Sequence, residues 1–256
     1  MLQLNFIKEG RGPTIVLSHA LGCDLHMWDG VAAQLARGYT VLRYDHRGHG
    51  KSEVAPGPYS IEAMADDAAA LIEEHAAGPV HFAGLSMGGM VAQQLAVRRP
   101  HLVASIVIAN SSSYYDEEAR AMWRARVATV LSQGMEPIAD GALQRWFTPE
   151  FRVDPEGSRH AAALRQVLVS TDAGAYAASC EAVARIDLRG SNPRIACPAL
   201  VIAGTRDQAA PTAMAEAIRD TISGAGFVVT EAAHLSAVEK PAEFANLVAG
   251  FIRGLA

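Results

Sequence analysis

The sequence has few lysines, few cysteines and few aromatic residues. Lysine occurs only three times, at Lys8, Lys51 and Lys240, which leaves few candidates for a catalytic lysine. The three cysteines, Cys23, Cys180 and Cys197, have neither zinc-site spacing nor the even number of a disulfide framework. We therefore expect reduced thiols. Only 6% of the residues are aromatic while alanine is plentiful, which favours closely packed helices over an all-β design.

Long apolar runs and excess positive charge are also missing. No window reaches the roughly 18 consecutive apolar residues of a membrane-spanning helix. Residues 1–7 lack the cationic and apolar segments of a signal peptide, so we expect a cytoplasmic protein that does not enter a membrane. The net charge of -5 and the pI near 6.0 argue against nucleic-acid binding. An anionic substrate would need a local cation.

The 256 residues suit one enlarged domain, and half of them are hydrophobic. Short runs rich in valine and isoleucine, bounded by turn residues, predict strands buried on both faces of a parallel sheet. These runs are Thr14–Ser18, Thr40–Asp45, Pro79–Gly84, Ala104–Asn110, Pro198–Gly204 and Gly226–Glu231. Helical patterns between them cover Trp28–Arg37, Ile61–Ala76, Met87–Arg98, Thr212–Thr221 and Ala242–Ile252, with Ser60 and Thr212 as expected N-caps. The alternation predicts an open α/β sheet.

The alternation breaks between residues 114 and 189, where no strand pattern occurs. We expect a helical cap over the active site, inserted into a core of residues 1–113 and 190–256. The alternative is a set of connecting helices packed elsewhere.

The strongest motif is Gly84-Leu85-Ser86-Met87-Gly88, between an expected strand and an expected helix. A glycine on either side of the serine allows a cramped turn that lifts its hydroxyl above the sheet. The following helix directs its amino end at the serine and favours negative charge there. We expect Ser86 to be a nucleophile; an inert serine in a glycine turn is the alternative.

A serine nucleophile needs a base, and in this architecture an acid and then a histidine follow it in the chain. His234 lies after the last expected strand, whereas His101 follows a helix end and His160 lies in the expected cap. Asp207 follows the strand Pro198–Gly204, and its rival Asp187 has no strand before it. We therefore expect His234 as base and Asp207 as the acid that orients it.

The oxyanion of the reaction needs two backbone N–H donors. We expect them from Met87, next to the nucleophile, and from Leu21 in the loop after the first expected strand. His46 and His49 invite a metal interpretation, but two histidines without a third ligand make no site, so we expect no metal. No P-loop or dinucleotide fingerprint appears, and we expect no cofactor.

The chain resembles the α/β-hydrolase superfamily, and more narrowly the 3-oxoadipate enol-lactonases, over nearly its whole length. The motifs that carry the resemblance are 18–22 (Ser-His-Ala-Leu-Gly) with Trp28, 44–52, 84–90, 145–149, 179–182 and 233–241. The resemblance implies an α/β-hydrolase fold, the roles already given to Ser86, Asp207 and His234, and an enol-lactone substrate that bears a carboxylate.

We expect a small-molecule ester or lactone substrate and leave the oligomeric state open. The side chains expected to contact substrate are Trp28, Trp123, Arg124, Arg126, Arg145 and Trp146, with the three arginines as candidates for binding a carboxylate. A broader esterase or lactonase, a perhydrolase-like enzyme, a carbon–carbon bond hydrolase and a non-catalytic binding protein on the same fold are the alternatives.

Overall fold

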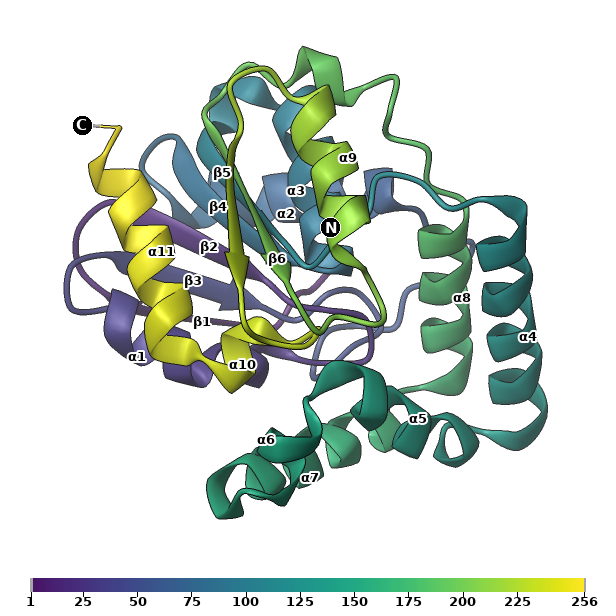
Figure 1. Cartoon of the computed structure of the whole chain (residues 1–256). Helices are drawn as coiled ribbons and strands as arrows, with labels where there is room; N and C mark the ends of the chain where they lie inside the picture. Colours follow the sequence, from purple (N-terminus) through teal and green to yellow (C-terminus); the bar gives the residue numbers. More distant parts are fainter. Residues whose placement is uncertain (1, 256) are drawn as a thin grey trace.

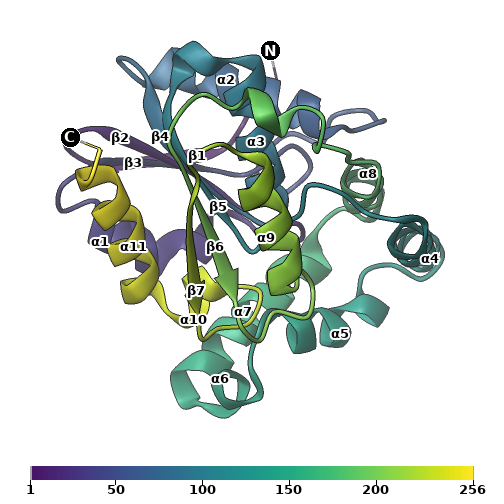
Figure 2. The ribbon, with the colours of Figure 1, turned by 45° about the horizontal axis from the view of Figure 1, so that its top comes forward.

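The apolar runs of the sequence form one central sheet in the computed structural model, which describes residues 2–255 (Figures 1 and 2). Its strands are β1 (Phe6–Gly10), β2 (Thr14–Ser18), β3 (Thr40–Tyr44), β4 (Val80–Leu85), β5 (Val103–Ala109), β6 (Ala199–Gly204) and β7 (Gly226–Thr230). Their order in the sheet is β1-β3-β2-β4-β5-β6-β7. Every neighbouring pair is parallel except β1 with β3. The prediction of an α/β fold is confirmed.

The strand β1 has no counterpart among the expected strands. It lies at the edge of the sheet, and its residues alternate between exposed and half-buried positions. Its sequence, Phe-Ile-Lys-Glu-Gly, therefore lacks the continuous apolar run that marks a strand buried on both faces. An antiparallel edge strand can face water, so a continuous apolar run does not mark it.

Helices cover both faces of the sheet. Figure 2 shows α1 (Asp29–Leu35) and α11 (Pro241–Arg253) on one side, and α2 (Ile61–His75), α3 (Met87–Arg98) and α9 (Thr212–Thr221) on the other. Short helices complete the core: η1 (Leu25–Trp28), η2 (Pro100–Leu102), η3 (Asn192–Arg194) and α10 (Ser236–Glu239). The bounds of α3 and α9 match the expected helices, and the ends of the others differ by one or two residues.

Between β5 and β6 the chain forms helices and no strand among the described residues. They are α4 (Glu117–Gln133), α5 (Glu136–Trp146), α6 (Pro149–Val153), α7 (Pro155–Ser170) and α8 (Ala173–Ala184), which we call the helical insertion. Figure 1 shows these teal and green helices beyond one end of the sheet. The two ends of the insertion meet, because Tyr114 pairs with Asp187 in an isolated antiparallel bridge.

The sheet brings distant loops together at the carboxyl ends of its strands. β2 and β4 are neighbours, and Ser18 pairs with Gly84 at their ends. After β2 the chain continues into α1 on one face of the sheet, and after β4 it continues into α3 on the other face. Ligand sites of open α/β sheets lie at such a switch point. The loop 19–22 therefore lies beside Ser86, which follows β4.

Within residues 2–255, no helix is both long enough and apolar enough to cross a membrane.

The two expected N-caps differ, and a pair of substitutions tests the difference. Ser60 accepts the Ala63 N–H at 3.1 Å. Thr212 is instead the first residue of α9, behind Pro211, and its hydroxyl donates to the Gly204 carbonyl at 3.4 Å. We expect Ser60→Ala to lower the free energy of unfolding by about 1 kcal/mol. Thr212→Ala should cost less, because no helix amide loses its partner. Urea unfolding measures both, and equal losses would contradict the assignment.

Candidate active site

Ser86 lies at a sharp backbone bend between β4 and α3. Its φ of 57° and ψ of -116° are rarely adopted by residues other than glycine. A Cβ atom at Gly84 would collide with the backbone of Gly88, and one at Gly88 would collide with the backbone of Ser18. Glycine at both positions therefore permits the bend, which presents Ser86 to a pocket.

His234 and Asp207 form a hydrogen-bonded pair after the last two strands. Nδ1 of His234 lies 2.8 Å from Oδ2 of Asp207, and the exposed fractions of these side chains are 6% and 0%. The other oxygen of Asp207 accepts the N–H groups of Ala209 and Ala210, both at 2.8 Å. The backbone thus holds the carboxylate, and the carboxylate holds the imidazole.

The charge of Asp207 fixes the tautomer of His234. Burial on its own would raise the pKa of Asp207, but the charge and hydrogen bond of His234 oppose this. Hydrogen bonds from the Ala210 amide and the Asn110 side chain act in the same direction, so the pKa of Asp207 lies below its usual value. An ionised carboxylate accepts the proton on Nδ1, which leaves Nε2 of the neutral ring free to act as a base.

Asn110, which follows β5, links the acid to the loop of the histidine. Its Nδ2 donates to Asp207 at 3.0 Å and to the carbonyl of Ala233 at 3.3 Å. Its Oδ1 accepts the hydroxyl of Ser236 at 2.6 Å, and its φ is 47°. In the sequence Asn110 stands only at the end of an expected strand. The signal was its residue type, because asparagine tolerates a left-handed backbone better than most residues.

Two backbone N–H groups next to Ser86 are available for an oxyanion. Neither the Leu21 nor the Met87 amide has a hydrogen-bond acceptor within residues 2–255, and Leu21 lines the same pocket as Ser86. Met87 begins α3, so its amide is one of the free donors at a helix N-terminus. The structure thus places both expected donors beside the serine.

Three buried histidines support the loop that carries Leu21. His19 Nδ1 donates to the Ala20 carbonyl at 2.7 Å, and its Nε2 accepts the His46 N–H at 2.9 Å. His49 Nε2 accepts the Gly22 N–H at 3.2 Å. Both ring nitrogens of His49 thus have protein partners, since its Nδ1 lies 3.1 Å from the Arg47 carbonyl. Nε2 of His46 lies 2.8 Å from the Ser18 hydroxyl.

The pocket that holds Ser86 and His234 has a volume of about 270 Å³ and lies between the sheet edge and the helical insertion. Four of the expected substrate-binding residues line it: Trp123, Arg126, Arg145 and Trp146. Arg126 lies over the Trp123 ring, 4.6 Å from its centroid. Burial, and after it the charge of Arg126, lowers the pKa of Arg145. Within residues 2–255 neither arginine forms an ion pair, and no carboxylate lines the pocket, so both arginines present positive charge to it.

The structure corrects two of the substrate-binding expectations. Trp28 is fully buried in the core, with its ring 5.6 Å from that of Phe244. Arg124 is exposed and pairs with Glu117 at 2.6 Å, outside the pocket. Arg124 and Arg126 are two positions apart on α4, which separates them by about 200° around the helix. They therefore point to opposite faces, and only Arg126 reaches the pocket.

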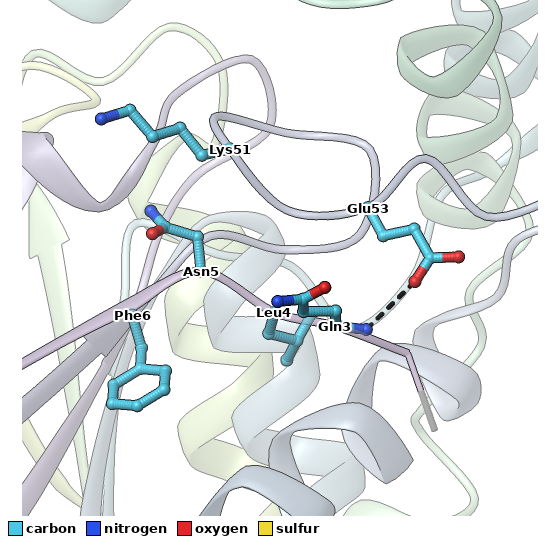
Figure 3. Close-up of a pocket in the computed structure, with 6 residues that line it drawn as sticks. All are labelled: Gln3, Leu4, Asn5, Phe6, Lys51 and Glu53. Atoms are coloured by element: carbon cyan, nitrogen blue, oxygen red, sulfur yellow. Dashed lines mark hydrogen bonds between the residues drawn. The ribbon is translucent and has the colours of Figure 1, made fainter.

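A larger hollow of about 550 Å³ lies elsewhere and lacks this chemistry. Figure 3 shows its lining: Gln3, Leu4, Asn5, Phe6, Lys51 and Glu53. The backbone N–H of Gln3 donates a hydrogen bond of 3.2 Å to the Glu53 carboxylate. It holds no serine or histidine, so the smaller pocket is the candidate active site.

Comparisons with known proteins agree with this architecture. The profile of the alpha/beta hydrolase fold family matches residues 13–241. The 3-oxoadipate enol-lactonase 2 of Acinetobacter baylyi is 38% identical over 96% of this chain and 91% of its own. The crystal structure of the enol-lactonase from Burkholderia xenovorans has a TM-score of 0.93 at 36% identity, covering 98% and 97% of the two chains. A malate-bound thermophilic esterase from Thermogutta terrifontis has a TM-score of 0.91 at 31% identity, covering 99% and 94%.

The chain therefore belongs to the alpha/beta hydrolase family, and it is a hydrolase.

The buried histidines predict a loss of stability in acid. Burial lowers the pKa of His49 from 6.5 to about 3 and also lowers the pKa of His19 and of His46. The unfolded chain therefore binds more protons than the folded one below pH 6.5, and the free energy of unfolding falls as the pH drops from there toward 3. Between these two pH values His49 contributes a slope of about 1.4 kcal/mol per pH unit. We expect His49→Gln, studied by denaturant unfolding between pH 7 and pH 4, to make the slope of the free energy of unfolding against pH shallower by about this amount. A slope equal to that of the wild type would contradict this.

Proposed function

We propose that the chain is a serine hydrolase that cleaves small carboxylic esters or lactones through an acyl-enzyme on Ser86. One arrangement carries the proposal. Ser86 lies at a strained bend and faces the same pocket as His234, whose ring is held by the ionised, buried Asp207. A serine hydroxyl is a poor nucleophile on its own, and an oriented neutral imidazole is the group that activates it.

The proposed reaction begins when Nε2 of His234 takes the proton of Ser86 and Oγ attacks the substrate carbonyl. The resulting oxyanion accepts the N–H groups of Leu21 and Met87, and one such donor contributes about 3–4 kcal/mol in other hydrolases. The tetrahedral intermediate then collapses, the bond between the carbonyl carbon and the leaving oxygen breaks, and His234 passes the proton that it took from Ser86 to the leaving group. The ring of His234 then takes a proton from water, whose oxygen attacks the acyl carbon. The bond between that carbon and Oγ breaks, His234 returns the proton to Ser86, and a carboxylic acid is released.

Within this class, we propose an enol-lactone that bears a carboxylate as the substrate. Opening of its ring releases an enolate, which takes a proton at carbon and becomes a ketone, and this step draws the reaction forward. The substrate carboxylate would lie against Arg126 and Arg145, which have no acidic partner in the described chain. The similarity of the chain to the enol-lactonases from Acinetobacter baylyi and Burkholderia xenovorans supports this choice, as does the malate, a dicarboxylate, in the related esterase.

We propose further that the helical insertion acts as a cap, with residues 114–189 forming a unit apart from the core. α4 supplies Trp123 and Arg126 to the pocket, and α5 supplies Arg145 and Trp146. The loops at the carboxyl ends of the strands supply Ser86 and His234. Recognition and chemistry would thus come from different parts of the chain.

The role of Ser86 is tested by substitution and by labelling. We expect Ser86→Ala to lower kcat on a lactone or ester by at least about 10³-fold, because no other group can form the acyl-enzyme. A fluorophosphonate should attach to Ser86 in the wild type, as located by mass spectrometry, and should leave Ser86→Ala unlabelled. Ser132→Ala, an exposed change on α4, is the control. Activity retained in Ser86→Ala, or a label on another residue, would overturn the proposal.

The role of the arginines is tested by comparing charged and neutral substrates. We expect Arg145→Gln to raise KM for the anionic enol-lactone by about 10- to 100-fold, the loss of one charge-assisted hydrogen bond. KM for a neutral short-chain ester should stay within twofold of the wild type. Arg124→Gln is the matched control, because Arg124 lies on the face of α4 that is turned away from the pocket. It should change neither KM value. Equal effects of Arg145→Gln on both substrates, or faster turnover of the neutral ester by the wild type, would favour a broad esterase instead.

A further inference from the structure

The loop that carries His234 follows β7 and is irregular, so its backbone N–H groups need partners from elsewhere. Two of those partners come from outside the loop. The Ala233 N–H, just before the histidine, donates to Oε2 of Glu239 at 2.6 Å. The Leu235 N–H, just after it, donates to the carbonyl of Trp146 at 3.0 Å. The base is thus held from both sides.

Glu239 makes a second bond that crosses to the helical insertion. Its other oxygen, Oε1, accepts the N–H of Thr148 at 2.6 Å. One carboxylate therefore joins the loop of the base to a segment that lies 91 positions earlier in the chain. Hydrogen bonds to a carboxylate are shorter and stronger than those between neutral groups. Both of these bonds are short.

The segment that Glu239 holds is part of the pocket wall. The side chain of Trp146 lines the pocket, Phe147 is buried, and Thr148 caps α6 by accepting the Phe151 N–H at 3.3 Å. The carbonyl of Trp146 accepts the Leu235 N–H of the His234 loop, and the N–H of Thr148 donates to Glu239 at the end of α10. The distance between the base and this wall is therefore set by the two bonds of Glu239 and by the bond from Leu235.

Another polar link between the insertion and the core is weaker. Arg206 pairs with Glu150 at 2.8 Å, and the exposed fractions of these side chains are 42% and 69%. Exposed ion pairs of this kind contribute little, about 0–1 kcal/mol. Glu239 is only half-exposed, and its partners are backbone groups with fixed positions. It is therefore the better candidate for setting the position of the wall.

We propose that Glu239 is a positioning residue, whose carboxylate holds the loop of His234 and the Trp146–Thr148 segment of the insertion at a fixed separation. The inference rests on the proposed function, because it assumes that His234 is the base. It implies that this part of the insertion does not open independently of the base. Substrate then enters on the other side of the pocket, between α4 and the loop before α9, where Met122, Gln208 and Pro211 are exposed lining residues.

The first test removes the carboxylate. We expect Glu239→Ala to lower kcat by about 10- to 100-fold, the range expected when a catalytic group shifts by about 1 Å. Labelling of Ser86 by a small fluorophosphonate should slow by a similar factor, because it depends on the base and needs little contact with the pocket wall. Glu231→Ala is the matched control, since Glu231 is an exposed glutamate of the same loop and makes no hydrogen bond or ion pair within residues 2–255. It should stay within twofold of the wild type in both measurements.

The second test removes the Thr148 N–H without changing the backbone. Thr148 has a φ of -63° and the preceding Phe147 has extended angles of -131° and 147°, so proline fits position 148. Thr148→Pro deletes the bond to Glu239, and Thr148→Ala is the control for the lost cap hydroxyl. We expect Thr148→Pro to lower kcat by about tenfold or more relative to Thr148→Ala. This difference should vanish when both changes are made in the Glu239→Ala background.

The outcomes separate the inference from the proposed function. Melting temperatures and circular dichroism establish that each variant is folded at the assay temperature, and if Glu239→Ala fails to fold, the two Thr148 variants decide. If kcat and the labelling rate of Glu239→Ala match those of Glu231→Ala, the inference is wrong. It is also wrong if the effect of Thr148→Pro persists without Glu239. If Ser86→Ala remains active, the proposed function itself is wrong, whatever Glu239 does.

Discussion

The arrangement of the site depends on one steric constraint, the bend at Ser86. A residue with a side chain is held at a φ of 57° because the end of β4 and the start of α3 come too close together for a wider turn. Such a conformation is unfavourable by about 1–3 kcal/mol and persists only where the surroundings enforce it. Here the glycines at 84 and 88 admit the neighbouring backbone, and the adjacent strand β2 brings the loop of Leu21 alongside. The position of Ser86 and the nearness of the Leu21 and Met87 amides to it both follow from this bend.

Much of the fold and of the site could be predicted because it depends on local patterns. Buried parallel strands give continuous apolar runs, and a serine between two glycines at a strand end marks a tight turn. The histidine and the aspartate were found from their places after late strands, since parallel strands bring such loops to one edge. The structure puts both next to the pocket of Ser86.

The rest could not be predicted because it depends on partners that are far apart in the chain. Asn110 and Glu239 are ordinary polar residues in the sequence, and only the folded chain shows that each bridges two backbone segments. Trp28 and Arg124 show the opposite error. The sequence predicts that both contact substrate, because Trp28 belongs with the motif of residues 18–22 and Arg124 is a cation of the helical insertion. In the structure Trp28 packs in the core and Arg124 faces solvent. Residue type alone does not fix the direction of a side chain.

The two arginines of the pocket wall bear on the stability of the fold. Arg126 and Arg145 line the same small pocket, and the charge of one disfavours the charge of the other. Guanidinium groups do not lose their protons in proteins, so the two side chains repel each other. An anion bound between them would relieve this repulsion, and it would favour the folded state by mass action because the unfolded chain has no such pocket. The anionic substrate proposed above would therefore protect the enzyme against unfolding at the concentrations at which it binds.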